Sequence, residues 1–279
     1  DNKRNKADFV LWFTKSKFDS QELKWDSPFG EGYPGWHIEC SGISLKYLGE
    51  YLDIHCGGVD NIFPHHTNEI AQTESYIGHS WCKYWVHGQH LNDASGKMSK
   101  SKGDTLTVNV LKEKGYNPLS YRFMCLLSHY RKQLTFTYDS LDGAENAYKK
   151  LKSKIIKLNN DGDIDVEGFN EFKKDFTNAL EDDLNTANAI SVIYEVLKSE
   201  YNDKTKLEVI KDFDRVLSLD LLKVDKVDIN EELIRQKIEE RNSAKLSKDY
   251  AKADLIREEL LTMGIVIRDT REGTTYEVI

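Results

Sequence analysis

Two lysines three residues apart, Lys97 and Lys100, lie in a polar stretch bounded by Gly96 and Gly103. The segment 97–101 reads Lys-Met-Ser-Lys-Ser, and the flanking glycines give the backbone freedom to move. Ammonium groups on such a loop can stabilise the charge that develops on a polyphosphate as it is cleaved. A solvated basic loop is the alternative interpretation, because runs of charged residues are common on protein surfaces.

A second set of side chains has the chemistry of a metal site. His65 and Glu69 are four residues apart, so a helix over this segment would place both on one face. Cys40 could add a thiolate, and one sulfur, one imidazole and one carboxylate form a ligand set that zinc accepts. Three protein ligands leave room for another ligand, which is typical of a catalytic zinc site. A buried cysteine and a helix-capping histidine are the alternative.

Size and charge narrow the possible functions. The chain has 279 residues, enough for two or more domains, and its formal charge of −8 argues against a protein that coats nucleic acid without selectivity. The segment from Lys97 to Lys132 nevertheless holds eight Lys or Arg residues against two acidic ones. A local basic surface on an acidic protein favours the binding of one defined polyanion.

The four cysteines have no spacing typical of a disulfide framework. The sequence also contains no signal peptide, transit peptide or long apolar run. We therefore expect a cytoplasmic protein with reduced cysteines and no membrane partner.

The composition changes near Pro118. All four prolines and all eight histidines lie at or before residue 129, and the later part has few helix-breaking residues. In the first part, short apolar runs alternate with turn residues and one helical segment, which predicts an α/β fold. The expected strands are 9–12, 51–55 and 84–87, and the expected helix is 68–77.

The later part predicts an α-helical bundle and then a small mixed α/β module. One helix should begin at Pro118, where a proline is tolerated in the first helical turn. The other expected elements are helices at 139–159, 167–181, 184–201 and 204–218, a linker at 222–228, helices at 230–243 and 248–263, and strands at 265–267 and 274–278.

Several motifs resemble those of the cysteinyl-tRNA synthetases, a family of class I aminoacyl-tRNA synthetases, in both order and spacing. They are the segments 35–41 (GWHIECS), 57–60 (GGVD), 63–72 (FPHHTNEIAQ) and 97–101 (KMSKS). The resemblance covers nearly the whole chain, from about Asp8 onward. It implies the C-terminal part of a class I Rossmann-like catalytic domain, followed by the helical bundle and the small mixed module.

This resemblance implies an ATP-dependent ligase that joins L-cysteine to its tRNA through a cysteinyl adenylate. In that family two cysteines, a histidine and a glutamate hold one zinc ion, and three of these positions match Cys40, His65 and Glu69. The substrate thiolate binds the zinc, whereas serine offers a harder ligand that is not readily deprotonated. Trp36 and His55 match positions that line the amino-acid pocket.

The expected nucleotide site includes Gly58 and Asp60, which resemble the G-G-x-D element of class I synthetases. The glycine lets the backbone approach ATP, and the aspartate can accept hydrogen bonds from ribose hydroxyls. Lys97 and Lys100 are the expected catalytic lysines, and we expect Lys100 to lie closer to ATP and its Mg²⁺. The segment 87–90 resembles the H-x-G-H signature of the class only superficially, and we interpret it as the end of a strand.

Other matches imply contacts with tRNA. Arg122 and Arg131 lie in the segments 117–123 and 129–131, which resemble the start of the helical domain that presents the anticodon stem in this family. The module 241–273 resembles the family's anticodon reader. Four of its side chains match positions that contact RNA in the family: Lys245, Asp254, Arg257 and Asp269. Their chemistry suits this role, because carboxylates can accept hydrogen bonds from base amino groups and cations can bind bases or phosphates.

The H-I-G-H signature and the first zinc cysteine of the family are not in this sequence. We therefore expect that this polypeptide alone does not activate cysteine and needs an N-terminal portion, and we expect a monomer. Two alternatives remain open. A related ligase that joins cysteine to an amino sugar would not need the module 241–273, and a noncatalytic tRNA-binding protein would have no use for Cys40, His65 and Glu69.

The sequence thus predicts four regions. They are the remainder of the catalytic domain with its zinc site (1–95), the KMSKS loop and stem-contact region (96–138), the helical bundle (139–222) and the anticodon-recognition module (223–279).

Overall fold

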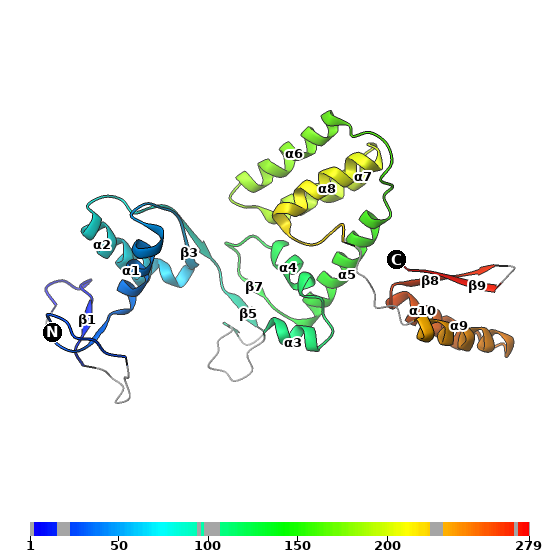
Figure 1. Ribbon diagram of the computed structural model, residues 1–279, viewed down its shortest axis with the longest axis horizontal. Helices are drawn as coiled ribbons and strands as arrows, with labels where there is room; N and C mark the ends of the chain where they lie inside the picture. Colours follow the sequence, from blue (N-terminus) through cyan, green and yellow to red (C-terminus); the bar gives the residue numbers. More distant parts are fainter. Residues whose placement is uncertain are drawn as a thin grey trace. The chain divides into compact units, whose positions relative to one another are not determined.

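The computed structural model describes residues 3–15, 23–93, 96–97, 107–223, 231–270 and 273–278. The chain divides into two compact units (Figure 1). The first unit comprises residues 1–110 and 128–140, and the second comprises residues 111–127 and 141–279. No helix among the described residues is both long and apolar enough to cross a lipid bilayer.

The first unit contains a strand–helix–strand arrangement that positions most of the candidate site. Strands β3 (Leu52–Gly58) and β4 (Cys82–Gly88) are parallel, and helix α2 (Thr67–Ile77) connects them. Helix α1 (Trp36–Leu48) packs against α2 (Figure 1). Parallel strands need a crossover connection of this kind, and their carboxyl ends lie at one edge of the sheet.

Short elements complete this unit. β1 pairs with β2, and β5 lies between β6, which is antiparallel to it, and β7, which is parallel to it. The bounds are β1 Trp12–Phe13, β2 Tyr33–Pro34, a 3₁₀ turn at Val59–Asn61, a π-type turn at Ile62–His66, β5 Leu91–Asp93, β6 Gly96–Lys97 and β7 Leu134–Thr135. Helix α3, Val108–Glu113, follows at the boundary of the two units.

The sequence predicted β3, β4 and α2 correctly but was wrong at two other places. The strand expected at 9–12 is only the two-residue β1, because Gly35 already donates its N–H to the Leu11 carbonyl and α1 begins at the next residue. Helix α1 was not expected from the sequence. Several of its large apolar side chains, including Trp36 and Leu48, are exposed, so the apolar residues do not form one buried stripe and the periodic signal is weak.

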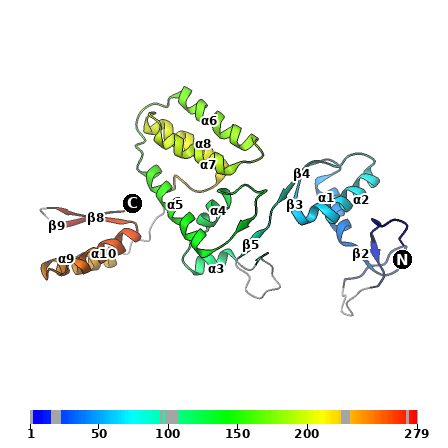
Figure 2. The ribbon, with the colours of Figure 1, turned by 180° about the vertical axis from the view of Figure 1, so that it is seen from behind.

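The second unit contains the predicted bundle (Figure 2). Helices α6, α7 and α8 pack against one another, and α4 packs against α7. The rings of Phe176 and Phe213 stack between α6 and α8, with centroids 4.0 Å apart. The bounds are α4 Pro118–Leu126, α5 Tyr138–Ile156, α6 Val166–Glu181, α7 Thr186–Lys198 and α8 Asp203–Leu217, which agree with the expected helices to within a few residues.

Local sequence explains why these helices begin where they do. An Asn or Asp side chain precedes each of four helices and accepts a hydrogen bond from a backbone N–H of the first turn. Such caps satisfy N–H groups that have no partner within the helix. The capping residues are Asn117, Asp165, Asn185 and Asn202.

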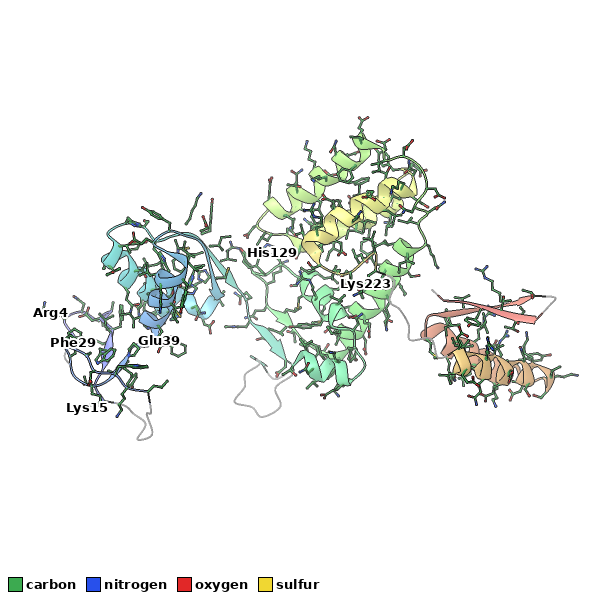
Figure 3. The ribbon with its side chains drawn as sticks, in the orientation of Figure 1. Arg4, Lys15, Phe29, Glu39, His129 and Lys223 are labelled. Carbon is green, nitrogen blue, oxygen red and sulfur yellow. The ribbon has the colours of Figure 1, made fainter. Side chains whose placement is uncertain are left out.

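The last part of the chain forms a small mixed module, as the sequence predicted. The described residues of this module begin at Glu231, and the described residues before it end at Lys223, which is labelled in Figure 3. The elements are α9 Glu231–Leu246, α10 Tyr250–Thr262, β8 Ile265–Thr270 and β9 Gly273–Val278. The strands form an antiparallel hairpin, and six buried side chains form the core under it: Ile234, Ile238, Ile256, Leu260, Ile265 and Ile267.

Candidate metal centre and neighbouring sites

The first unit brings Cys40, His65 and Glu69 together. Cys40 lies on α1, His65 precedes α2, and Glu69 lies in the first turn of α2. One ligand atom from each residue lies within 4.8 Å of the other two. The packing of α1 against α2 therefore brings the soft sulfur ligand of Cys40 to His65 and Glu69, which lie just before and in the first turn of α2.

Glu69 is the most unusual member of this set because its side chain is fully buried. Its two carboxylate oxygens lie 2.6 Å from His65 Nε2 and 2.8 Å from His55 Nε2. Neither close contact has the alignment of a hydrogen bond, and within the described residues both oxygens lack a hydrogen-bond partner. Burial raises the pKa of Glu69 to about 7. A buried carboxylate in this state fits a cation, which would supply the missing stabilisation.

The imidazole of His65 is oriented by its neighbours. Its Nδ1 lies 2.8 Å from Nδ1 of His37, so one of these rings donates to the other, while its Nε2 faces Glu69. The Trp36 ring meets His65 edge-on, with centroids 6.0 Å apart. Holding the second nitrogen of a ligating histidine in this way fixes the ring and the nitrogen that faces the metal.

A second possible ligand set shares the same carboxylate: His55, His66 and Glu69. His66 is 3% exposed, and its Nδ1 lies 2.8 Å from Nε2 of His87. Burial, reinforced by the neighbouring imidazoles, lowers the pKa of His66 to about 4. His66 is therefore neutral at pH 7, which is the form in which histidine binds metals.

Burial and the nearby Glu69 carboxylate raise the pKa of the Cys40 thiol. Zinc accepts sulfur, nitrogen and carboxylate oxygen together, so the set that contains Cys40 fits this ion better than the second set. The donor atoms of these residues therefore suit zinc. A thiol, an oriented imidazole nitrogen and a buried carboxylate without a hydrogen-bond partner in the described part of the chain lie close together.

Sequence reasoning gave too little weight to His37, His66 and His87. The segment 87–90 does lie at the end of a strand, as expected, but His87 also contacts the buried His66. The register of β3 and β4 explains this, because it pairs His55 with Trp85 and Gly57 with His87. Alternate residues of a strand face the same side, so both strands direct chemistry-bearing residues to one face. The period-two spacing of Trp85 and His87 was the signal available in the sequence.

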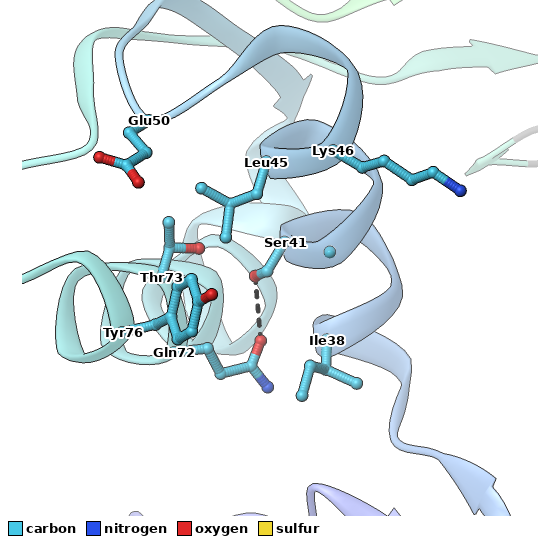
Figure 4. Close-up of a pocket in the computed structure, with 9 residues that line it drawn as sticks. Ile38, Ser41, Leu45, Lys46, Glu50, Gln72, Thr73 and Tyr76 are labelled. Carbon is cyan, nitrogen blue, oxygen red and sulfur yellow. Dashed lines mark hydrogen bonds between the residues drawn. The ribbon is translucent and has the colours of Figure 1, made fainter.

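A cavity of about 640 Å³ lies beside this set and has Trp36 and His37 in its wall. Trp36 is 74% exposed, so its indole is available to a ligand. A second cavity, of about 510 Å³, lies between α1 and α2, where Ser41 donates a hydrogen bond to Gln72 (Figure 4). None of the predicted site residues lines this second cavity.

The expected nucleotide residues lie at the carboxyl end of β3. A Cβ on Gly58 would lie 2.5 Å from Oδ1 of Asp60, so only glycine lets the backbone approach this carboxylate without displacing it. His90 Nε2 lies 4.0 Å from the same oxygen. Lys97 lies in β6, where it pairs with Asn92 of β5, while Lys100 lies outside the described residues.

Two of the expected tRNA contacts take part in local packing. The Arg122 Nε donates to the Leu217 carbonyl over 2.7 Å, which joins α4 to the end of α8. The Arg131 guanidinium lies over the Tyr130 ring, 5.2 Å from its centroid. Arg122 belongs to the second unit and Arg131 to the first.

The C-terminal module brings Lys245 and Asp269 into contact, with Nζ 2.8 Å from Oδ2. Asp254 and Arg257 are exposed and three residues apart on α10, so they share one face of that helix. The structure thus groups the four expected RNA-contacting residues in one module.

Comparison with known proteins identifies the family to which the chain is similar. The catalytic domain described as tRNA synthetases class I (C) matches residues 1–146, and the DALR domain matches residues 175–218. Similar proteins are a cysteine–tRNA ligase of Treponema denticola, 44% identical over 99% of this chain and 62% of its own length, and one of Borreliella burgdorferi, 42% identical over 98% and 61%. A cysteine–tRNA ligase 1 of Burkholderia lata is 41% identical over 97% and 57%.

The chain therefore spans about three fifths of the length of these relatives. A solved ternary complex of the Agrobacterium radiobacter K84 agnB2 LeuRS with tRNA and LeuAMS matches 72% of this chain and 33% of that one, at 15% identity and a TM-score of 0.47. The class I (C) catalytic domain alone accounts for more than half of the 279 residues. On this basis the chain belongs to the class I tRNA synthetases of the (C) group.

Proposed function

We propose that this chain is the part of a cysteine–tRNA ligase that selects cysteine and binds tRNA. The reaction is the ATP-dependent ligation of L-cysteine to its cognate tRNA through a cysteinyl adenylate. The observation that carries the proposal is the convergence of Cys40, His65 and Glu69 within 4.8 Å, in a chain 41–44% identical to proteins named cysteine–tRNA ligase.

Cys40, His65 and Glu69 would hold one zinc ion. When bound, zinc supplies a soft Lewis acid that binds the thiolate of cysteine and discriminates against the hydroxyl of serine. The protein contributes the orientation of the ligands, because His37 fixes the ring of His65 and the packing of α1 on α2 fixes Cys40. The buried surroundings of Glu69 exclude water from this edge of the site.

Trp36 and His55 would bind the rest of the amino acid. The indole of Trp36 lies at the edge of His65, and the imidazole of His55 contacts Glu69. Both side chains therefore border the three ligands from different elements, α1 and β3. A substrate held between them would have its side chain directed toward Cys40, His65 and Glu69.

ATP, with Mg²⁺, would bind at the carboxyl end of β3 through Gly58 and Asp60, with Lys97 and Lys100 on its phosphates. The two lysines would stabilise charge on the leaving pyrophosphate. In a protein of the length of the relatives, Lys100→Ala should lower kcat for cysteine activation far more than it raises the KM for cysteine. An unchanged kcat would contradict this role.

The helical bundle and the C-terminal module would bind tRNA. Arg122 and Arg131 are the proposed stem contacts, and Lys245, Asp254, Arg257 and Asp269 are the proposed anticodon contacts. The regions 1–95, 96–138, 139–222 and 223–279 are the proposed functional divisions, in a cytoplasmic monomer. A cysteine–amino-sugar ligase would not need the folded module formed by α9, α10 and the β8–β9 hairpin.

The test is cysteine-dependent ATP–pyrophosphate exchange, measured on this chain alone and on a protein that also contains the portion present only in the longer relatives. We expect exchange with L-cysteine, far less with L-serine, and only in the longer protein. Equal exchange with serine would contradict the selection of a thiol. Robust exchange by these 279 residues alone would contradict the need for the additional portion.

A further inference from the structure

Three side chains make four contacts with the carboxylate of Asp269, near the end of β8. The Arg241 guanidinium donates to both oxygens, with distances of 3.0 Å to Oδ1 and 2.9 Å to Oδ2. The Lys245 ammonium donates to Oδ2 over 2.8 Å, and the Thr274 hydroxyl lies 2.9 Å from Oδ1. These hydrogen bonds hold the pKa of Asp269 far below its usual range, so the carboxylate is ionised at neutral pH.

The two cations differ in how firmly they are held. The Arg241 side chain is only 6% exposed, and it reaches Asp269 from the buried side of α9. The Lys245 side chain is 40% exposed, and Asp269 itself is 46% exposed. A planar buried guanidinium bound at two points is a fixed support, whereas a hydrated ammonium on a flexible stem can move at small cost.

The hydrogen-bonding capacity of Oδ2 is then full. A carboxylate oxygen offers about two lone-pair sites, and Arg241 and Lys245 occupy both sites of Oδ2. Thr274 has one hydrogen, and its hydroxyl also lies 3.1 Å from Asn242 Oδ1. An RNA base can therefore donate to Asp269 at Oδ2 only after Lys245 leaves that oxygen.

We propose that Lys245 is a displaceable cation that occupies the base-reading edge of Asp269 in the free protein, and that Arg241 is a positioning residue that holds this carboxylate for RNA. A base amino group replaces the Lys245 ammonium on Oδ2, and the released ammonium binds a backbone phosphate of the same RNA. The inference rests on the proposed anticodon-reading function. It adds that the two cations have different roles, because Lys245 binds a phosphate and Arg241 positions the carboxylate.

The two roles affect two different measurable properties, the salt dependence of RNA binding and the discrimination between bases. Lys245 contributes a phosphate contact, which changes the salt dependence of binding without carrying sequence information. Arg241 fixes the carboxylate that reads a base, so its loss reduces discrimination between bases. Lysine in place of Arg241 keeps the charge but loses the two-point contact.

The experiment measures binding of RNA hairpins to the full chain by fluorescence anisotropy across a range of salt concentrations. One hairpin carries the anticodon loop of a cysteine tRNA, and in the others each anticodon base is replaced in turn. The variants are Lys245→Met, Arg241→Lys and Asp269→Asn. The matched control is Lys252→Met, because Lys252 is 51% exposed and forms an ion pair with the exposed Glu240 over 3.0 Å.

Lys245→Met should make the negative slope of log K against log salt shallower by about 0.7, the value for one phosphate of single-stranded RNA, and should keep the base preference. Arg241→Lys and Asp269→Asn should reduce the preference at one anticodon base by roughly tenfold, the loss of one good base contact. The Lys252→Met control should change neither property.

A base preference lost in Lys245→Met would overturn the proposal, because Lys245 would itself read the base. A wild-type base preference in Arg241→Lys would overturn the positioning role alone. If the wild-type chain shows no preference among the hairpins, both this inference and the anticodon-reading function fail. Hydrogen exchange of α9 and α10 verifies that each variant is folded. If Arg241→Lys unfolds the module, Lys245→Met still tests whether the Lys245 ammonium is displaced from Asp269, because Lys245 is exposed.

Discussion

The Glu69 carboxylate lies 2.6 Å from Nε2 of His65, with no hydrogen-bond alignment, on a side chain that is fully buried. A buried charge without a donor is costly, and proteins usually avoid it or compensate it. The Cys40 sulfur lies within 4.8 Å of both ligand atoms, so a zinc ion bound by these three residues would compensate the charge.

The metal content of the purified chain should depend on these ligands. Cys40→Ser and Glu69→Gln should each reduce bound zinc, measured by atomic absorption after dialysis, at least tenfold relative to the wild-type chain, as expected for the loss of one of three protein ligands. Cys56→Ser is the matched control, because Cys56 follows His55 on β3 and so faces the opposite side of the sheet. Equal zinc content in Cys40→Ser and Cys56→Ser would remove Cys40 from the site.

Gly57 is required for the close packing of His66. A Cβ at this position would lie 2.6 Å from Cε1 of the buried His66 ring. We expect Gly57→Ala to destabilise the first unit by about 1–3 kcal/mol, the usual cost of overpacking. All five tryptophans lie in this unit, so urea unfolding followed by tryptophan fluorescence measures its stability separately. In Gly88→Ala the new Cβ meets no atom of the described residues within 4 Å, so a similar loss there would contradict the packing argument.

Tyr148 links α5 to the segment that follows α8. Its buried hydroxyl donates to the Leu219 carbonyl over 2.6 Å, so Tyr148→Phe leaves a buried carbonyl without this donor. The expected loss is about 1–3 kcal/mol in the free energy of unfolding of the bundle, followed by helical circular dichroism in urea. Tyr201→Phe removes a comparable but exposed contact to Glu171 and should cost less than about 0.5 kcal/mol. Equal effects would show that the Tyr148 hydrogen bond contributes nothing specific.

The C-terminal module should lose stability in acid. The hydrogen bonds from Arg241 and Lys245 lower the pKa of Asp269 in the folded state. A lowered carboxyl pKa stabilises the fold above the unfolded pKa, and this contribution is lost as the pH falls below it. Because Asp269 is 46% exposed, we expect about 1 kcal/mol after allowance for solvent screening.

Amide exchange of α9, compared near pH 6 and below about pH 3 after correction for intrinsic rates, measures this loss. Asp269→Asn should be less stable near pH 6 and should not lose this increment on acidification. An acid-induced loss as large in Asp269→Asn as in the wild-type chain would assign the effect to other groups.

The bundle could be predicted from sequence because local signals there agree. Amphipathic spacing marks α6 to α8, and asparagine or aspartate caps mark where they begin. Helix α1 was missed for the opposite reason, since Trp36 and Leu48 point to solvent rather than to a common buried stripe.

The site was predicted only in part. The i, i+4 spacing of His65 and Glu69 is local, so it could be read directly. The contact of His87 with His66 depends on the parallel register of β3 and β4, which local sequence does not specify. Similarly, Asp269 was expected to be available to RNA, but its occupation by Arg241 and Lys245 arises only when α9 packs beside β8.

The most direct test adds Co²⁺ to the metal-free chain and records the thiolate-to-cobalt charge-transfer absorption. We predict a band from Cys40 in the wild-type chain, an increase on addition of L-cysteine and no increase with L-serine. In Cys40→Ser the initial band should be absent. A wild-type band that does not respond to L-cysteine, or that responds equally to L-serine, would contradict the claim that Cys40, His65 and Glu69 hold a metal that selects the substrate thiol.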